Sequence, residues 1–121
     1  MWLVTKFGFF SVVRKPDDGP GMLTVRARVK SDLVALRDGY LPTLGAITSS
    51  EGTDYRFRAR VAKAALGEAV GKIALDVNYS NFKDEVAVRQ GKGRATAYGR
   101  VWEALRALQG PSGGQRARRG A

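Results

Sequence analysis

Two segments of the sequence carry a basic side chain at every second position. The basic residues are Arg26, Arg28 and Lys30 in the first segment and Arg56, Arg58 and Arg60 in the second. The residues that alternate with them are Leu23, Val25, Ala27, Val29, Tyr55, Phe57, Ala59 and Val61. A period of two is that of a β-strand whose faces meet different surroundings. The pattern therefore predicts two strands with apolar side chains against a core and six cations on the opposite, exposed face.

Six cations on one sheet face would attract a polyanion. Alternate strand residues lie about 7 Å apart, which roughly matches successive phosphates of a nucleic-acid strand. Few acids are placed to neutralise these cations, and the outward positions hold arginine where an RNA-recognition sheet would hold stacking rings. We therefore predict a non-catalytic module that binds DNA, RNA or another polyanion by phosphate contacts. The structural alternative is that long basic side chains keep exposed strands from aggregating.

The chain contains no histidine and no cysteine. Ser-His-Asp chemistry, cysteine nucleophiles, disulfides and metal sites built from these residues are therefore excluded. A histidine-free, toxin-like ribonuclease is the third candidate function, because Lys or Arg can stabilise the transition state while a carboxylate or tyrosine moves the proton. Residues of these types are Tyr55, Tyr79, Lys83, Glu85 and Tyr98. Their spacing selects no catalytic set, so we assign no catalytic residue, metal or cofactor.

Two further features have both a functional and a structural interpretation. The segment Gly91-Lys92-Gly93-Arg94 precedes a predicted helix and could bind phosphate, but it lacks the spacing of a P-loop and is typical of a linker. Phe9 and Phe10 point to opposite faces of a strand, so one of them is either under a helix or exposed, and an exposed one would suggest a partner surface. The second candidate function is a protein-interaction module, an inhibitor or adaptor of a larger and possibly nucleic-acid-processing enzyme, in which the basic face meets an acidic protein partner or a nucleic-acid channel.

The order of the predicted elements indicates an α+β fold. Strands are expected within residues 2–15, 23–30 and 55–61, with a small edge strand near Ile47, and helices over 31–40, 62–77, about 80–90 and about 94–108. Ser31 is the predicted cap of the first helix, and Asn78 or Ser80 that of the third. This order predicts an antiparallel sheet with helices packed on one face and C-terminal helices after the strands.

The last predicted helix has one apolar stripe. Its residues are Tyr98, Val101, Trp102, Leu105 and Leu108. Because they recur at helical spacing, the stripe is expected to pack on the domain, so that Trp102→Ala would cost about 3–5 kcal/mol.

Composition limits the chain to one small domain. It has 121 residues, 44% of them hydrophobic, and a formal net charge of +10. We predict a single α+β domain over residues 1–109 and a disordered basic tail over 110–121. Without the three tail arginines, 18 basic and 11 acidic residues remain, a net charge of +7. No apolar run suits a membrane span or signal peptide, so we expect a cytoplasmic protein without a membrane partner.

Several motifs resemble those of a family of small uncharacterised bacterial and phage proteins. They are the MWxVTxxGFFSVV-like opening at residues 1–13, the strand at 23–28, residues 54–58, the YxNFK motif at 79–83, Ala97-Tyr98 and Val101-Trp102. The resemblance covers nearly all of residues 1–110. It implies a self-contained cytosolic module, found also in mobile elements, and it carries over no functional residue.

Overall fold

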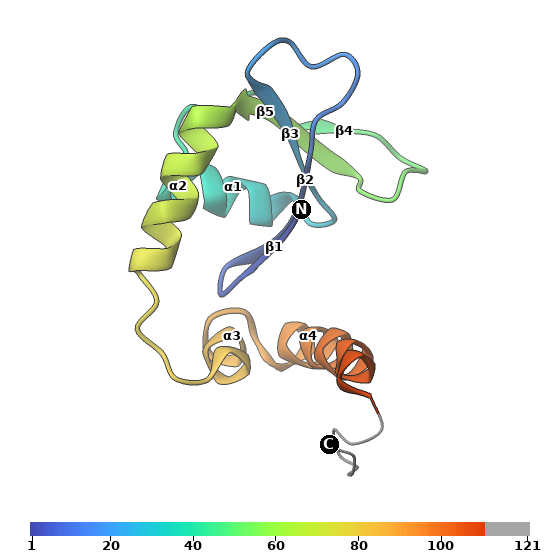
Figure 1. Cartoon of the computed structure of the whole chain (residues 1–121), viewed down its shortest axis with the longest axis vertical. Helices are drawn as coiled ribbons and strands as arrows, with labels where there is room; N and C mark the ends of the chain where they lie inside the picture. The colour runs from blue at the N-terminus through green and yellow to red at the C-terminus, as the bar shows by residue number, and fades with distance from the viewer. Residues whose placement is uncertain (111–121) are drawn as a thin grey trace. The chain divides into compact units, whose positions relative to one another are not determined.

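A computed structural model of the chain describes residues 1–110 and has the predicted α+β fold (Figure 1). The described residues form five strands and four α-helices, and the last two helices follow all of the strands. The strands are β1 (Trp2–Thr5), β2 (Gly8–Val13), β3 (Met22–Ala27), β4 (Thr48–Ser49) and β5 (Phe57–Ala62). The helices are α1 (Lys30–Gly39), α2 (Lys63–Leu75), α3 (Phe82–Gln90) and α4 (Lys92–Leu105), followed by the short 3-10 helix η1 (Arg106–Gln109). Part of the expected basic tail, residues 111–121, lies outside the described residues.

The strands form one antiparallel sheet in the order β1-β2-β3-β5-β4. Its register confirms the alternation predicted for the central strands. Val12 pairs with Val25, and Val25 pairs with Ala59 on the next strand. Since directly paired residues share a face of the sheet, these three side chains form one buried row.

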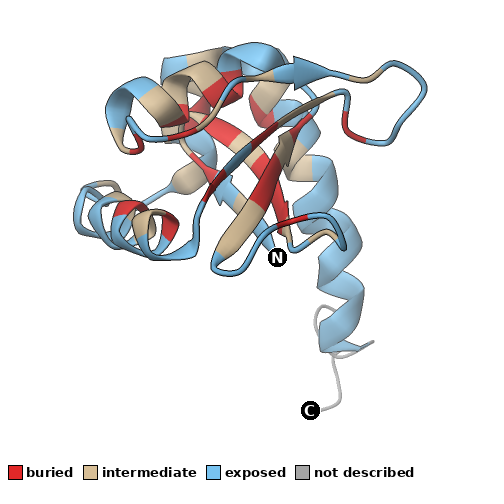
Figure 2. Cartoon of the chain, turned by 90° about the horizontal axis from the view of Figure 1, so that it is seen from above, coloured by how far each residue is buried: buried red, intermediate tan, exposed pale blue. Residues whose placement is uncertain are grey.

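The core lies between this face and the helices α1 and α2. Phe10, Val25, Leu33 and Leu36 are fully buried, and Leu66 of α2 is 3% exposed. Helix α1 contacts β2, β3 and β5, while α2 contacts β5. Figure 2 shows the buried residues running along the central strands. The core therefore lies on one face of the sheet.

The junction between β3 and α1 differs from the prediction. Strand β3 ends at Ala27, Val29 is the N-cap residue and is 39% exposed, and Lys30 is the first residue of α1. Ser31 makes no cap hydrogen bond. The chain turns early because Asp32 is buried beside β2, where its Oδ2 accepts a hydrogen bond of 3.0 Å from the backbone N–H of Phe9. Lys30 therefore does not belong to the basic sheet face.

The chain divides into two compact units, Met1–Asn78 and a helical unit that begins at Tyr79. In the helical unit, α3 is capped by Asn81 in place of the predicted Asn78 or Ser80, because the Asn81 side chain accepts a 2.9 Å hydrogen bond from the backbone of Asp84. Helices α3 and α4 pack through the buried Val86 and Ala95 and through the stacked rings of Phe82 and Tyr98. This unit is therefore a short helical hairpin.

The apolar stripe of α4 is exposed, contrary to the prediction. Trp102 is 63% exposed, and Val101, Leu105 and Leu108 are exposed as well. The physical reason is that α3 is shorter than α4. Phe82 is the first residue of α3, and its ring stacks on Tyr98 of α4. The residues of α4 after Tyr98 therefore extend beyond the end of α3.

Trp102→Ala is expected to change the free energy of unfolding by about 1 kcal/mol or less, because the indole is mainly exposed and loses little burial. Val86→Ala in the same unit should be more destabilising, since it leaves a cavity at a fully buried position. Denaturant unfolding of both variants measures the difference. A loss of about 3–5 kcal/mol in Trp102→Ala would contradict the exposed position of Trp102 and would support the buried stripe predicted from the sequence.

Candidate nucleic-acid interface

The sheet face opposite the core carries a row of residues from neighbouring strands. Trp2 pairs with Ser11, Ser11 with Arg26, and Arg26 with Arg58. Because paired residues share a face, these side chains point away from the core. Arg28 follows the last residue of β3, Arg56 precedes the first residue of β5, and Arg60 lies two residues farther along β5 than Arg58. The five arginines predicted for this face are therefore brought together, whereas Lys30 is not.

Tyr55 lies against this face as well, contrary to the prediction that it would face the helices. Strand β5 begins only at Phe57, so the alternation does not extend back to Tyr55. Its ring contacts Phe9 at a centroid distance of 6.3 Å, and its side chain is covered, with the residue 5% exposed. Trp2 in turn meets Phe9 edge to face, with centroids 5.4 Å apart. The rings of Trp2, Phe9 and Tyr55 thus form a series of contacts, which the alternation along the strands did not predict.

Two guanidinium groups stack on the Tyr55 ring. The Cζ atoms of Arg26 and Arg28 lie 4.6 Å and 4.7 Å from its centroid. Arg28 also lies 5.9 Å from the centroid of Phe9. Such cation–π contacts hold an arginine in place and leave its charge intact. We call Trp2, Phe9, Tyr55, Arg26, Arg28 and Arg58 the arginine-aromatic face.

Neutral acceptors hold the three arginines of this face. Arg26 donates to Ser11 Oγ at 2.7 Å, Arg28 Nε to the Asp54 carbonyl at 3.2 Å, and Arg58 to the Tyr55 carbonyl at 3.0 Å. Within residues 1–110, no carboxylate forms an ion pair with any of the three. Arg26 and Arg58 are also directly opposed, a like-charge arrangement that destabilises a sheet. The face therefore holds three positioned cations whose charge is not neutralised by acids.

Arg56 and Arg60 have acidic partners that the sequence analysis did not anticipate. Arg56 pairs with Glu51 at 2.8 Å, and both side chains are largely exposed. Arg60 pairs with Asp17 and Asp18, the latter at 3.0 Å. These acids come from the turns before β3 and β5, which fold back beside the strands. Arg56 and Arg60 consequently flank the arginine-aromatic face with much of their charge compensated.

Asp18 anchors the turn between β2 and β3. Its carboxylate accepts hydrogen bonds from the Lys15 backbone N–H at 2.8 Å and from Thr24 Oγ1 at 2.9 Å, in addition to the Arg60 contact. The pKa of Asp18 is lowered from its ordinary value of 3.8, chiefly by the hydrogen bond from Lys15, against the opposing effect of burial, and further by Thr24 and Arg60. The charged form is thus the one that the fold stabilises.

A lowered pKa in the folded state makes the contribution of Asp18 depend on pH. It is complete above the pKa of the unfolded chain, about 4, and is lost as the pH falls through the lower pKa of the folded protein. We therefore expect the unfolding free energy to decrease below about pH 4, and to decrease less in Asp18→Asn. Chemical unfolding at several acidic pH values measures this. Parallel pH profiles of the wild type and the variant would contradict the assigned role of Asp18.

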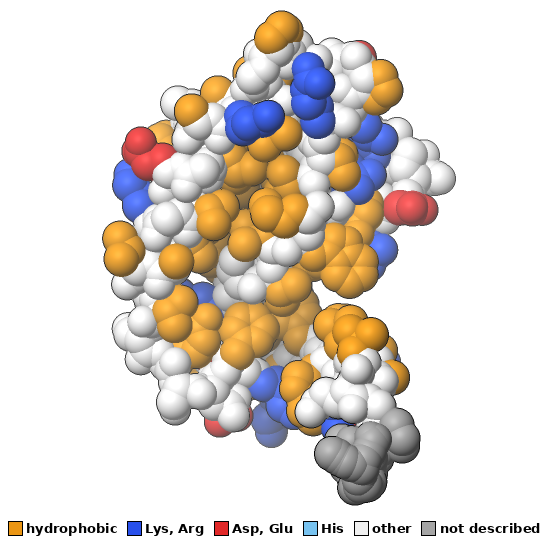
Figure 3. Space-filling model, viewed as in Figure 1, with side chains coloured by type: hydrophobic (Ala, Val, Ile, Leu, Met, Phe, Trp, Pro, Cys, Tyr) orange, Lys and Arg blue, Asp and Glu red, His pale blue; other side chains and the backbone are white. Residues whose placement is uncertain are grey.

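Basic and hydrophobic side chains adjoin one another near the edge of the sheet. Figure 3 shows Lys and Arg side chains beside hydrophobic ones close to β4, the strand next to β5.

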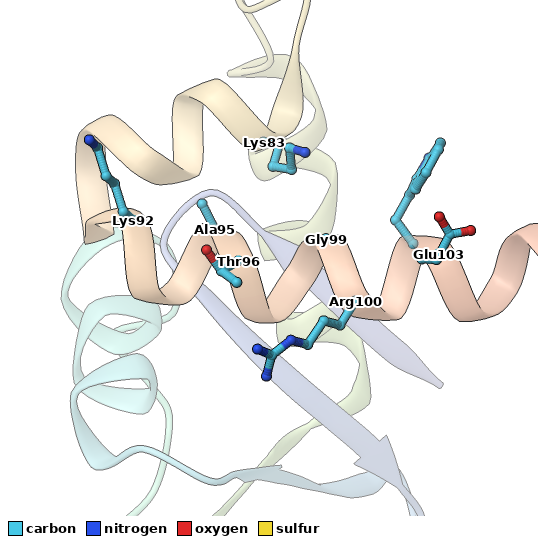
Figure 4. A pocket seen from close by; sticks show the side chains of 8 residues that line it. Lys83, Lys92, Ala95, Thr96, Gly99, Arg100 and Glu103 are labelled. Atoms are coloured by element: carbon cyan, nitrogen blue, oxygen red, sulfur yellow. The ribbon is translucent and has the colours of Figure 1, made fainter.

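A second group of basic residues lies in the helical unit. Lys83, Lys92 and Arg100 line a shallow hollow with Gly99 and Glu103. Figure 4 shows Lys83 over α4 near Gly99, whereas Arg100 points away from Lys83. The cations therefore do not converge on one point. Gly91 is both the C-cap of α3 and the N-cap of α4, with a φ of 91° that favours glycine, so this segment serves as the turn of the hairpin.

The residues available to a ribonuclease are divided between the units. Tyr55 belongs to the first unit, whereas Tyr79, Lys83, Glu85 and Tyr98 belong to the helical unit. Glu85 forms an ion pair with Arg89 at 3.1 Å. The hairpin thus gathers candidate residue types, with the Glu85 carboxylate already engaged by Arg89.

Two other kinds of site are absent from the described residues. Residues 1–110 contain no group of three or more acidic side chains placed to hold a metal ion, and none of their helices combines the length and apolarity needed to span a bilayer. Comparisons of the chain with protein-family models, curated proteins and solved structures find no match.

Proposed function

We propose that the protein is a non-catalytic module that binds nucleic acid through the arginine-aromatic face. The observation that carries this proposal is a set of three arginines that are held by neutral acceptors, two of them also by an aromatic ring, and that have no acidic partner within residues 1–110. Opposed like charges destabilise the free sheet, and a phosphate backbone would remove that repulsion on binding. The net charge of +10 would also steer the chain toward a polyanion.

Arginine is the residue type suited to this ligand. Its planar guanidinium can bind a phosphate by two hydrogen bonds while one side of the plane rests on a ring. Arg26 and Arg28 are already oriented on Tyr55, so binding would require little additional ordering. Because nucleic acids are ligands of the cytoplasm, this function also fits the cytoplasmic location expected from the sequence.

Arg28→Ala tests the proposal. We expect weaker binding to random-sequence oligonucleotides, and a slope of log affinity against log salt that is smaller by about 0.7 for a single strand or about 0.9 for a duplex. Arg37→Ala is the matched control, because it removes the same charge from α1, where Arg37 pairs with Asp38. Fluorescence anisotropy over a series of salt concentrations measures both variants. An unchanged slope in Arg28→Ala, or no affinity of the wild type at low salt, would refute the proposal.

The second candidate function is a protein-interaction module. The exposed hydrophobic side chains at the end of α4 favour it, because contiguous exposed apolar residues mark interaction surfaces. A pull-down before and after nuclease treatment separates the two candidates. A partner retained after nuclease treatment, together with no oligonucleotide binding by the purified chain, would favour protein interaction.

A further inference from the structure

Trp2 has a property that phosphate binding alone does not require. Its side chain is large and apolar, yet it is 59% exposed on the edge strand β1. It lies on the same face as Arg26, because both residues pair with Ser11 in the sheet register. The arginine-aromatic face therefore offers an open indole beside positioned cations.

The ring contacts of Trp2 leave this indole available to a ligand. Trp2 and Phe9 meet edge to face, with an angle of 89° between their planes. Such a contact is favourable, but it covers only part of the indole. Phe9 is itself half-buried and connects Trp2 to Tyr55. The series thus positions the exposed ring without covering it.

Tyr55 contributes in a different way. It is nearly buried, so a ligand cannot stack directly on it. The guanidinium groups of Arg26 and Arg28 lie over its ring, so Tyr55 holds two cations in place. Trp2 consequently provides the stacking surface, and the two arginines provide charges that suit phosphates.

Stacking surfaces distinguish single strands from duplexes. In a duplex the faces of the bases are stacked on one another, and a protein reaches only their edges and the backbone. In a single strand the bases can turn outward and stack on aromatic side chains, largely without regard to sequence. A face that bound phosphate alone would have no such preference.

We propose that the arginine-aromatic face binds single-stranded nucleic acid in preference to duplex, with a base stacked on Trp2 and phosphates on Arg26, Arg28 and Arg58. This inference rests on the proposed function and adds the class of ligand to it.

The test compares three probes with the full chain: a single-stranded oligonucleotide, the duplex of the same sequence, and inorganic polyphosphate, which has charge but no bases. We expect the single strand to bind more tightly than the duplex. Trp2→Ala should weaken single-strand binding about 5- to 150-fold, the range expected for one stacked base, and leave polyphosphate binding unchanged. Trp2→Phe should retain most of the affinity, and Trp102→Ala is the matched control for loss of an exposed tryptophan.

Tryptophan fluorescence provides a second readout. The chain has two tryptophans, so in a Trp102→Phe background all tryptophan emission comes from Trp2. Single strands should quench this emission, whereas polyphosphate should not. Equal affinity for single strand and duplex, or full single-strand binding by Trp2→Ala, would overturn the inference while the proposed function stands. Failure of the wild type to bind either oligonucleotide, at low salt as well, would overturn the proposed function itself.

Discussion

Phe10→Ala is expected to lower the free energy of unfolding by about 3–5 kcal/mol. Phe10 has no exposed surface, and it is among the largest fully buried side chains of the core. Its loss would leave a cavity between β2 and the helices. Since small domains have a stability of about 5–15 kcal/mol, a substantial part of the fold's stability would be removed. Denaturant unfolding followed by circular dichroism measures the effect.

The neighbouring Phe9 is the matched control for this prediction. It points to the opposite face of β2, where it contacts Trp2 and Tyr55. Phe9→Ala should therefore destabilise the protein less than Phe10→Ala, but it should weaken single-strand binding because Trp2 loses its support. Equal destabilisation by the two substitutions would contradict the assignment of their faces.

Gly8→Ala is expected to destabilise the protein by about 1–3 kcal/mol, the usual effect of overpacking. A Cβ atom at this position would lie 2.8 Å from Cβ of Asp32 and 2.9 Å from the Phe10 ring. Neither neighbour can move freely, because Asp32 belongs to α1 and binds the Phe9 backbone. Helix α1 would have to shift away from β2. Thermal unfolding, with oligonucleotide binding as a second readout, measures the change.

Gly67→Ala is the control for Gly8→Ala. Gly67 lies inside α2, and no atom is close to the position of an added Cβ. Alanine should raise stability there by about 0.5–1 kcal/mol, because it is a better helix former. If Gly8→Ala were as stable as the wild type, the close approach of α1 to β2 would not hold.

The buried side of the sheet could be predicted from the sequence with good accuracy. The alternation in residues 23–27 and 57–61 depends on the geometry of a strand alone, so Val25, Ala59 and Val61 were assigned to the correct face. Phe57 is half-buried on the same face. The order of strands and helices likewise predicted the α+β class, since it depends on local patterns.

The site was less predictable, because its features depend on contacts between distant residues. Trp2, Phe9 and Tyr55 meet only after three segments have been paired and folded, and the bend before β5 reverses the face on which Tyr55 lies. The pairing of Arg60 with Asp18 depends on the path of a turn 42 residues away. Alternation gave no signal for either feature.

The differences at the helices have their causes in the neighbouring elements. Ser31 has the residue type of a cap, but the early start of α1 at Lys30 leaves Val29 in the cap position. The stripe of α4 has the spacing of a buried face, yet α3 is too short to cover it. The spacing of apolar residues identifies a stripe, but it carries no information on the length of the helix that packs against it.

Ultraviolet cross-linking to a single-stranded oligonucleotide, followed by mass spectrometry of tryptic peptides, tests nucleic-acid binding by the arginine-aromatic face most directly. Trypsin separates residues 1–6, which contain Trp2, from residues 7–14, which contain Phe9. We predict cross-links on these two peptides, with the cross-link on residues 1–6 lost in Trp2→Ala and unchanged in Trp102→Ala. Cross-links confined to α4 or to residues 111–121, with none on residues 1–14, would contradict the proposed interface.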